Sequence, residues 1–165
     1  MKPDFDALLA PGRHNLSLGE FRAKFVDALG SERRQMIWKC FSGLVVDLER
    51  HRILCELWVD GSFTSAKPDP TDIDFSLMIL SKDANDLTSD ALDFLLSIDS
   101  PFEKYKEVLD LYICRVYDAD DPGGREDDPQ GWARQWSVEH NEVWLKGFAV
   151  LRLGDSGYGR LRHCA

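Results

Sequence analysis

The sequence predicts an α+β fold in one domain of 165 residues. Two stretches with helical spacing precede the first apolar strand candidate, and further strand and helix patterns alternate after it. The length suits a single domain with a substantial core. Neither an internal repeat nor a domain boundary is apparent, so we expect residues 1–165 to form one unit.

The N-terminal third is predicted to contain an irregular lead-in over residues 1–16 and then two helices. Ser17 and Glu20 have the spacing of a capping box, and Gly30 is placed to end that helix after about Leu29. Ser31 can cap a longer second helix. Apolar residues at spacings of three and four predict one buried stripe on it, made of Met36, Ile37, Phe41, Leu44, Val45 and Leu48.

The middle of the chain is predicted to supply three strands. Residues 53–59 have the composition of a buried strand, and the apolar run within 72–80 indicates a strand buried on both faces. Residues 81–86 indicate a polar connection and 87–98 a helix. Residues 108–117 are the strongest later strand candidate.

The C-terminal third is predicted to be less regular. Residues 118–130 are acidic and rich in Pro and Gly, which is typical of a surface loop. A short helix is expected over 132–139 and a last strand over 143–153. We expect residues 154–165 to form a flexible tail.

Composition excludes several classes of protein. The net charge of -9 argues against non-specific nucleic-acid binding, which depends on Lys and Arg. The acidic N-terminus does not resemble a signal peptide, and no stretch approaches the length of a membrane span, so we expect a cytoplasmic protein without membrane contact. The four scattered cysteines favour free thiols over a zinc site or disulfides.

The strongest chemical signal is a pair of aspartates that follows a Gly-Ser turn. Asp72 and Asp74 alternate with Ile73 and Phe75, so in a strand both carboxylates point to one face. Carboxylates so close repel each other, and a divalent cation such as Mg²⁺ removes that conflict. The sequence therefore predicts a site for a metal and phosphate groups.

These residues resemble the signature of the DNA polymerase β-like nucleotidyltransferase superfamily. That signature has a Gly-Ser pair and, after a spacer like the nine residues between Ser62 and Asp72, an acid-apolar-acid-apolar strand. Residues 67–74 are similar to a stretch of aminoglycoside adenylyltransferases. More loosely, most of the chain resembles a group of small, uncharacterised, mainly prokaryotic nucleotidyltransferase-like proteins, through Pro11-Gly12, His14, Phe21, the Gly-Ser-Phe-Thr segment and Lys146-Gly147.

The resemblance implies a nucleotidyltransferase-like mixed sheet with flanking helices, two of them before the first strand. It implies Mg²⁺ or Mn²⁺, an NTP with ATP expected, and transfer of a nucleoside monophosphate to a protein, RNA or small-molecule acceptor. Asp110, on a later strand, fits the third carboxylate of the family. The implied catalytic and metal-binding residues are Asp72, Asp74 and Asp110, and the implied nucleotide-binding residues are Gly61, Ser62, Lys67 and Lys146.

Each assignment has a structural alternative. Gly61-Ser62 alone is a common turn, Asp110 fits a solvated strand end as well, and a loop lysine such as Lys67 more often faces solvent. No segment remains for the helical acceptor domain of the aminoglycoside enzymes. The acceptor site is then small, borrowed from a homo-oligomer, or supplied by a protein partner. The alternative function is a non-catalytic binding module of the same fold, such as an antitoxin-like or phage-defence partner or an NTP sensor.

Overall fold

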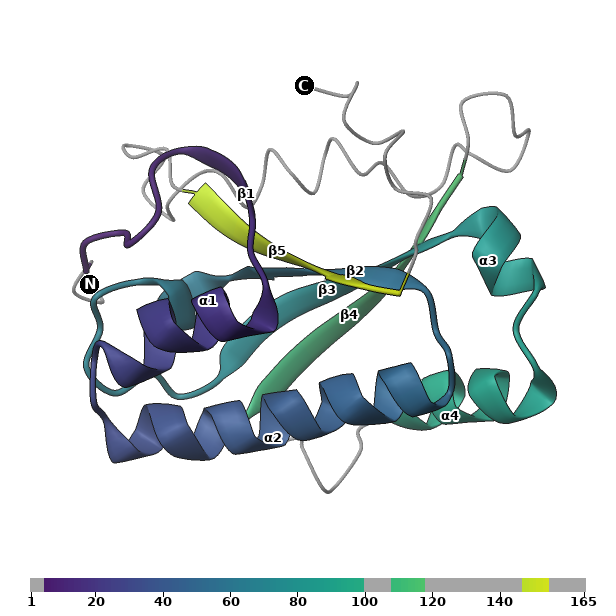
Figure 1. The fold of residues 1–165 in the computed structure, drawn as a ribbon, viewed down its shortest axis with the longest axis horizontal. Helices are drawn as coiled ribbons and strands as arrows, with labels where there is room; N and C mark the ends of the chain where they lie inside the picture. Colours follow the sequence, from purple (N-terminus) through teal and green to yellow (C-terminus); the bar gives the residue numbers. More distant parts are fainter. Residues whose placement is uncertain (1–4, 100–107, 118–146, 155–165) are drawn as a thin grey trace.

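The computed structural model of this chain describes residues 5–99, 108–117 and 147–154 (Figure 1). It combines helices with a five-stranded mixed sheet, which confirms that part of the predicted fold. The elements follow in the order β1 (Gly12–Asn15), α1 (Leu18–Arg22), the π-helix η1 (Ala23–Asp27), α2 (Glu32–Arg50), β2 (Cys55–Asp60), the 3-10 helix η2 (Gly61–Thr64), β3 (Ile73–Leu80), α3 (Ser81–Asn85), α4 (Ser89–Asp99), β4 (Leu109–Val116) and β5 (Gly147–Leu153).

The strands are ordered β1-β5-β2-β3-β4 across the sheet. The central strand β2 pairs antiparallel with both β5 and β3. The two outer pairs, β1 with β5 and β3 with β4, are parallel. Because β2 runs against β3 and β4, its end lies beside the starts of those two strands.

The two faces of the sheet are covered differently. Helices α1, α2 and α4 lie on one side (Figure 1), and their apolar side chains join those of the strands in the main core. We call this side the helix face. The opposite side, here called the second face, carries a smaller apolar cluster made of Trp58, Met78, Leu80, Cys114, Val116, Phe148 and Val150.

The two N-terminal helices begin where the sequence predicts. The Ser17 hydroxyl accepts the Glu20 N–H at 3.2 Å, and the Glu20 carboxylate accepts the Ser17 N–H at 2.8 Å, which completes the capping box. The helix then widens into η1 instead of continuing as an α-helix to Leu29. The α2 helix begins after Ser31, whose hydroxyl accepts the Arg34 N–H at 3.4 Å.

Three local predictions are wrong. Residues 12–15 form β1 inside the expected irregular lead-in, because β5 supplies hydrogen bonds from far along the chain. Residues 81–85 form α3 where a polar connection is predicted, since one helical turn is too short to show periodicity. Met36 is 42% exposed, because the residue before Ile37 is turned by about 100° from the buried stripe.

Several predictions fall outside the described residues, namely the loop over 118–130, the helix over 132–139, the start of the last strand over 143–146 and the tail beyond Gly154. The single-unit organisation of residues 1–165 stays a prediction. The described cysteines, Cys40, Cys55 and Cys114, are free thiols, and burial raises the pKa of Cys55. Within the described ranges, no helix has both the length and the apolar character needed to cross a membrane.

Candidate active site

Four aspartates lie where the end of β2 meets the starts of β3 and β4. Asp60 ends β2 in register with Asp74 of β3, and Asp74 is in register with Asp110 of β4. Registered residues on neighbouring strands have Cα atoms about 5 Å apart and point to the same face. Asp72 lies just before the first residue of β3 and two residues from Asp74, so it is near the other three along the chain but outside the strand register. We call these four residues the carboxylate row.

Exposure changes along the carboxylate row. Asp60, on the central strand, is only 6% exposed. Asp72 and Asp74 are half-buried, and Asp110, on the edge strand β4, is exposed. Three of the four carboxylates therefore remain at least partly accessible to a ligand.

Gly61 is fitted against the side chain of Asp74. Its φ is +75°, which lies in the left-handed region that favours glycine. A Cβ added at Gly61 would lie 1.9 Å from Asp74 Oδ2 and 2.7 Å from its Cγ. Glycine is therefore required here for two independent reasons, and the Gly61-Ser62 turn brings backbone directly beside the carboxylate row.

The turn is held from the helix face by Arg34, a fully buried cation of α2. Its Nη1 donates to the carbonyl oxygens of Phe25 and Phe63, both at 2.7 Å. Its Nη2 donates to those of Ser65 at 2.8 Å and Lys67 at 2.7 Å. Burial lowers the pKa of Arg34 to about 10, which still leaves the guanidinium charged at neutral pH. One side chain thus fixes three carbonyl groups that follow Gly61-Ser62.

The rest of the loop between η2 and β3 is attached to the first turn of α2. The Ser31 hydroxyl donates to Asp69 Oδ1 at 2.6 Å. The Arg33 guanidinium donates to the carbonyl oxygen of Pro70 at 3.3 Å and also to that of Thr71. The spacer between the Gly-Ser turn and the aspartates is therefore an ordered loop whose path is set by α2.

The predicted nucleotide-binding residues have different positions. Ser62 is half-buried in η2, beside the carboxylate row. Lys67 is also half-buried, and its described hydrogen bonds use its backbone: the carbonyl accepts from Arg34 and the N–H donates to Ser65 Oγ at 3.3 Å. Lys146 lies outside the described residues. The structure thus places the Gly-Ser turn at the same end of the sheet as the register pair Asp74 and Asp110, with Asp72 directly before β3.

Two residues of the site are absent from the sequence-based prediction. Asp60 directly precedes Gly61, and its alternation with Trp58 was a usable signal that it faces the same way as Asp74. Arg34 lies three residues before Ile37, on the line of the buried stripe of α2. A charged residue in such a stripe indicates a buried partner, although the sequence does not identify which backbone groups it binds.

The donor chemistry of the carboxylate row fits Mg²⁺ or Mn²⁺. Within residues 5–99, 108–117 and 147–154, no three His, Cys, Asp or Glu side chains are grouped closely enough to hold a metal by themselves. Mg²⁺ usually takes one or two carboxylates and completes its ligands with waters and substrate phosphates. Oxygen-only donors and the close contact between the Gly61 backbone and the Asp74 side chain are compatible with such a site.

Comparison with known proteins gives one match. Residues 3–152 match the family described as "Family of unknown function (DUF6932)". No curated protein and no solved structure matches the chain.

Proposed function

The chain belongs to the family of unknown function DUF6932, and we propose from the geometry of its site that it is a metal-dependent nucleotidyltransferase. It transfers a nucleoside monophosphate from an NTP, with ATP the expected donor, to a hydroxyl group of an acceptor. The acceptor oxygen forms a bond to the α-phosphorus, the bond to the β-phosphate oxygen breaks, and pyrophosphate leaves.

The single observation that carries this proposal is the register of Asp74 with Asp110 beside the Gly61 turn. Two carboxylates on adjacent parallel strands offer oxygen ligands from neighbouring positions. The missing side chain at Gly61 lets the backbone of the turn lie directly against the Asp74 carboxylate, so a triphosphate whose metal is bound at Asp74 would lie beside the Gly61-Ser62 turn. Phosphoryl transfer depends mainly on such positioning and on charge stabilisation.

Each residue has a defined task in this proposal. Asp72 and Asp74 bind the divalent cation, and the Gly61-Ser62 backbone lies against the triphosphate. When bound, Mg²⁺ or Mn²⁺ supplies positive charge that offsets the charge of the phosphates and of the carboxylate row. Asp110, the most exposed member, accepts the proton of the attacking hydroxyl, because an acceptor can reach the edge strand.

The test measures binding of each α-labelled NTP with Mg²⁺ or Mn²⁺, and transfer of the label to protein, RNA and small-molecule acceptors. We expect metal-dependent binding by the wild type and a loss of about 100-fold or more in transfer for Asp74→Asn and Asp110→Asn. Asp93→Asn is the matched control. It removes an exposed carboxylate of α4, on the helix face, and should change neither measurement.

The outcomes separate the proposals. If the wild type binds no NTP in the presence of either metal, the nucleotidyltransferase proposal is wrong. If Asp74→Asn binds NTP and metal as tightly as the wild type does, the carboxylate row is not the site. Tight metal-dependent binding without transfer to any acceptor would instead favour the non-catalytic binding module or NTP sensor.

A further inference from the structure

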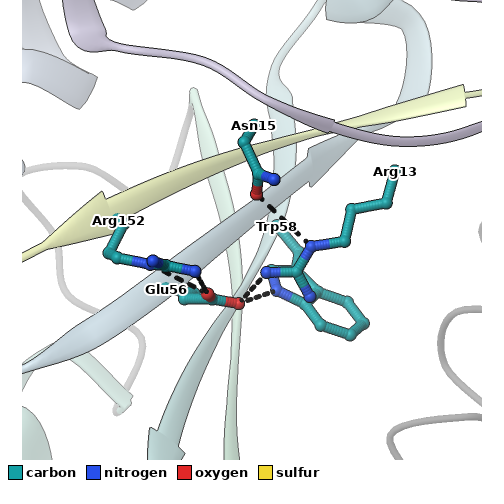
Figure 2. A network of polar contacts seen from close by, with 5 residues as sticks. All are labelled: Arg13, Asn15, Glu56, Trp58 and Arg152. Carbon is teal, nitrogen blue, oxygen red and sulfur yellow. Dashed lines mark hydrogen bonds and ion pairs between the residues drawn. The ribbon is translucent and has the colours of Figure 1, made fainter. Parts of the chain in front are cut away.

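A second charged group lies on the same face of the sheet as the carboxylate row. It is centred on Glu56 of β2, whose side chain is fully buried, and it includes Arg13 of β1 and Arg152 of β5 (Figure 2). Glu56 Oε2 accepts from Arg13 Nη2 at 2.6 Å, and Oε1 accepts from Arg152 Nη2 at 3.0 Å and Nε at 3.3 Å. We call Arg13 and Arg152 the arginine pair, and Glu56 is the carboxylate that they share.

Neighbouring side chains hold this arrangement in one geometry. The Trp58 indole donates to Glu56 Oε2 at 2.9 Å, so both carboxylate oxygens are engaged. The Arg13 guanidinium lies 5.3 Å from the centre of the Trp58 ring and donates from Nε to Asn15 Oδ1 at 3.4 Å. Because their positions are fixed before any ligand arrives, binding by these guanidiniums costs little conformational entropy.

The charges of the arginine pair are not balanced within the described part of the chain. Both of its ion pairs there go to the one carboxylate of Glu56, which leaves one positive charge over. The side chains are 22% exposed for Arg13 and 33% exposed for Arg152, so both can meet solvent or a ligand. A guanidinium carries five N–H donors, and the bonds to Glu56 and Asn15 use only some of them.

A purely structural role accounts for only part of this arrangement. The ion pairs link the short edge strand β1 to β5 and β2, and removing one partner of a buried pair is costly. One arginine would be enough to neutralise Glu56. The second, partly exposed guanidinium is explained if the pair also binds an anion, for which the planar fork of arginine is well suited.

The position of the pair indicates which substrate carries that anion. Glu56 and Asp60 alternate on β2 and point to the same face, about 13 Å apart for four residues of strand. This inference rests on the proposed function: with its triphosphate at Gly61, an NTP has an uncharged base and ribose at its other end. The remaining anionic group must then belong to the second substrate.

We propose that Arg13 and Arg152, oriented by buried Glu56, bind a phosphate group of the acceptor, so that the acceptor is a phosphorylated molecule. A substrate that lies along β2 then has its phosphate at the arginine pair and its reacting hydroxyl at the carboxylate row. The acidic protein attracts this anion locally, through two fixed guanidiniums, despite a net charge of -9.

The test uses inorganic phosphate as the probe, in EDTA, so that no metal can hold it at the carboxylate row. We expect saturable phosphate binding by the wild type and by Asp74→Asn. Arg152→Gln and Arg13→Gln should weaken it by about 10-fold or more, which is about 1.4 kcal/mol. Arg50→Gln is the matched control, because Arg50 is an exposed arginine of α2 whose ion pair to Asp47 lies on the helix side.

Thermal unfolding checks that each variant is folded. If Arg152→Gln does not fold, Arg152→Lys replaces it, since a lysine keeps the charge but loses the fork and should still bind phosphate more weakly. The proposal is overturned if the wild type binds no phosphate, or if the folded Arg13 and Arg152 variants bind it like the wild type.

Metal-dependent NTP binding is measured in parallel and should be unchanged in Arg152→Gln. If the wild type binds phosphate but no NTP, the proposed function is contradicted, whereas the phosphate site itself is supported.

Discussion

Ser76 and Leu77 are neighbours in β3 and are equally buried, yet they belong to opposite faces of the sheet with different contents. Leu77, 0% exposed, faces the helices and is part of the main core. Ser76, 1% exposed, points to the second face, between the levels of Asp74 and Met78. Burial alone therefore does not distinguish the two faces; the polarity of what is buried does.

This difference shows how the domain separates two tasks. Among the described residues, the helix face is lined with apolar side chains and has one buried cation, Arg34, which binds backbone carbonyl groups of the loop at the site. The second face combines an apolar cluster with carboxylates and arginines. Burying such charged groups costs free energy unless they are paired or bind a ligand. We therefore expect the helix face to contribute most of the stability and the second face to carry the residues of the candidate site.

The largest effect on stability is expected at Arg34, the buried residue of the helix face that binds the loop at the candidate site. Arg34→Met should lower the free energy of unfolding by about 3–5 kcal/mol, because four carbonyl groups lose a buried charged donor. Metal-dependent NTP binding should be lost as well in protein that remains folded. Urea denaturation gives the first quantity. The control Arg50→Met removes an exposed ion pair and should cost less than about 1 kcal/mol.

The main core provides the next effect. Leu77→Ala should cost about 2–5 kcal/mol, since it removes a fully buried side chain and leaves a cavity between the sheet and the helices. At a temperature where the variant is folded, NTP binding should be nearly unchanged, because Leu77 points away from the carboxylate row. A variant that stays stable but loses NTP binding would contradict the separation of the two faces.

A smaller but more local effect is expected at the turn. Gly61→Ala should cost about 2 kcal/mol or more, because it combines left-handed backbone strain with displacement of the Asp74 carboxylate. Gly30→Ala is the matched control: its φ is +64°, but a Cβ there would meet nothing within 4 Å. We expect similar strain in both variants and loss of metal-dependent NTP binding only in Gly61→Ala. Equal binding by the two variants would show that the Asp74 position is unimportant.

The smallest effect is expected at Ser76. Its buried Oγ has no hydrogen-bond partner among the described residues, so Ser76→Ala should change stability by less than about 1 kcal/mol and can raise it. Thr64→Val is the comparison, because the Thr64 hydroxyl donates to the Gly61 carbonyl at 3.1 Å, and its removal should cost about 1 kcal/mol. A cost above about 2 kcal/mol for Ser76→Ala would reveal a partner beyond the described residues.

Local signals predicted the starts of the two N-terminal helices and the buried strands β2 and β3 well, because the physical cause of each lies within a few residues. The capping box of Ser17 and Glu20 and the cap at Ser31 concern groups within one helical turn, and both are present. The strand over 72–80 was predicted from a continuous apolar run and differs from β3 by one residue. The short strand β1 was missed, because four residues have no strand signal of their own and need β5 as a partner.

The candidate site also has one part that the local sequence predicts and another that depends on strand pairing. Strand alternation predicts that Asp72 and Asp74 share one face, but β3 begins only at Ile73, so for Asp72 this stays a prediction. The positions of Gly61 and Ser62 before them were visible in the sequence. The sequence also contained Asp110 as an acidic residue in an apolar strand. It did not contain the register that sets Asp60, Asp74 and Asp110 side by side, because pairing depends on strands that meet only after the chain folds.

The sequence by itself determined the combination of helices with a mixed sheet, the starts of the two N-terminal helices and the alternation of acidic and apolar residues. Only the tertiary structure decided that Gly61 lies against Asp74, that Arg34 binds the loop carbonyls, and that Arg13 and Arg152 share Glu56. The physical reason is distance along the chain. Caps and alternation depend on neighbouring residues, whereas these contacts join segments that are brought together by packing around one sheet.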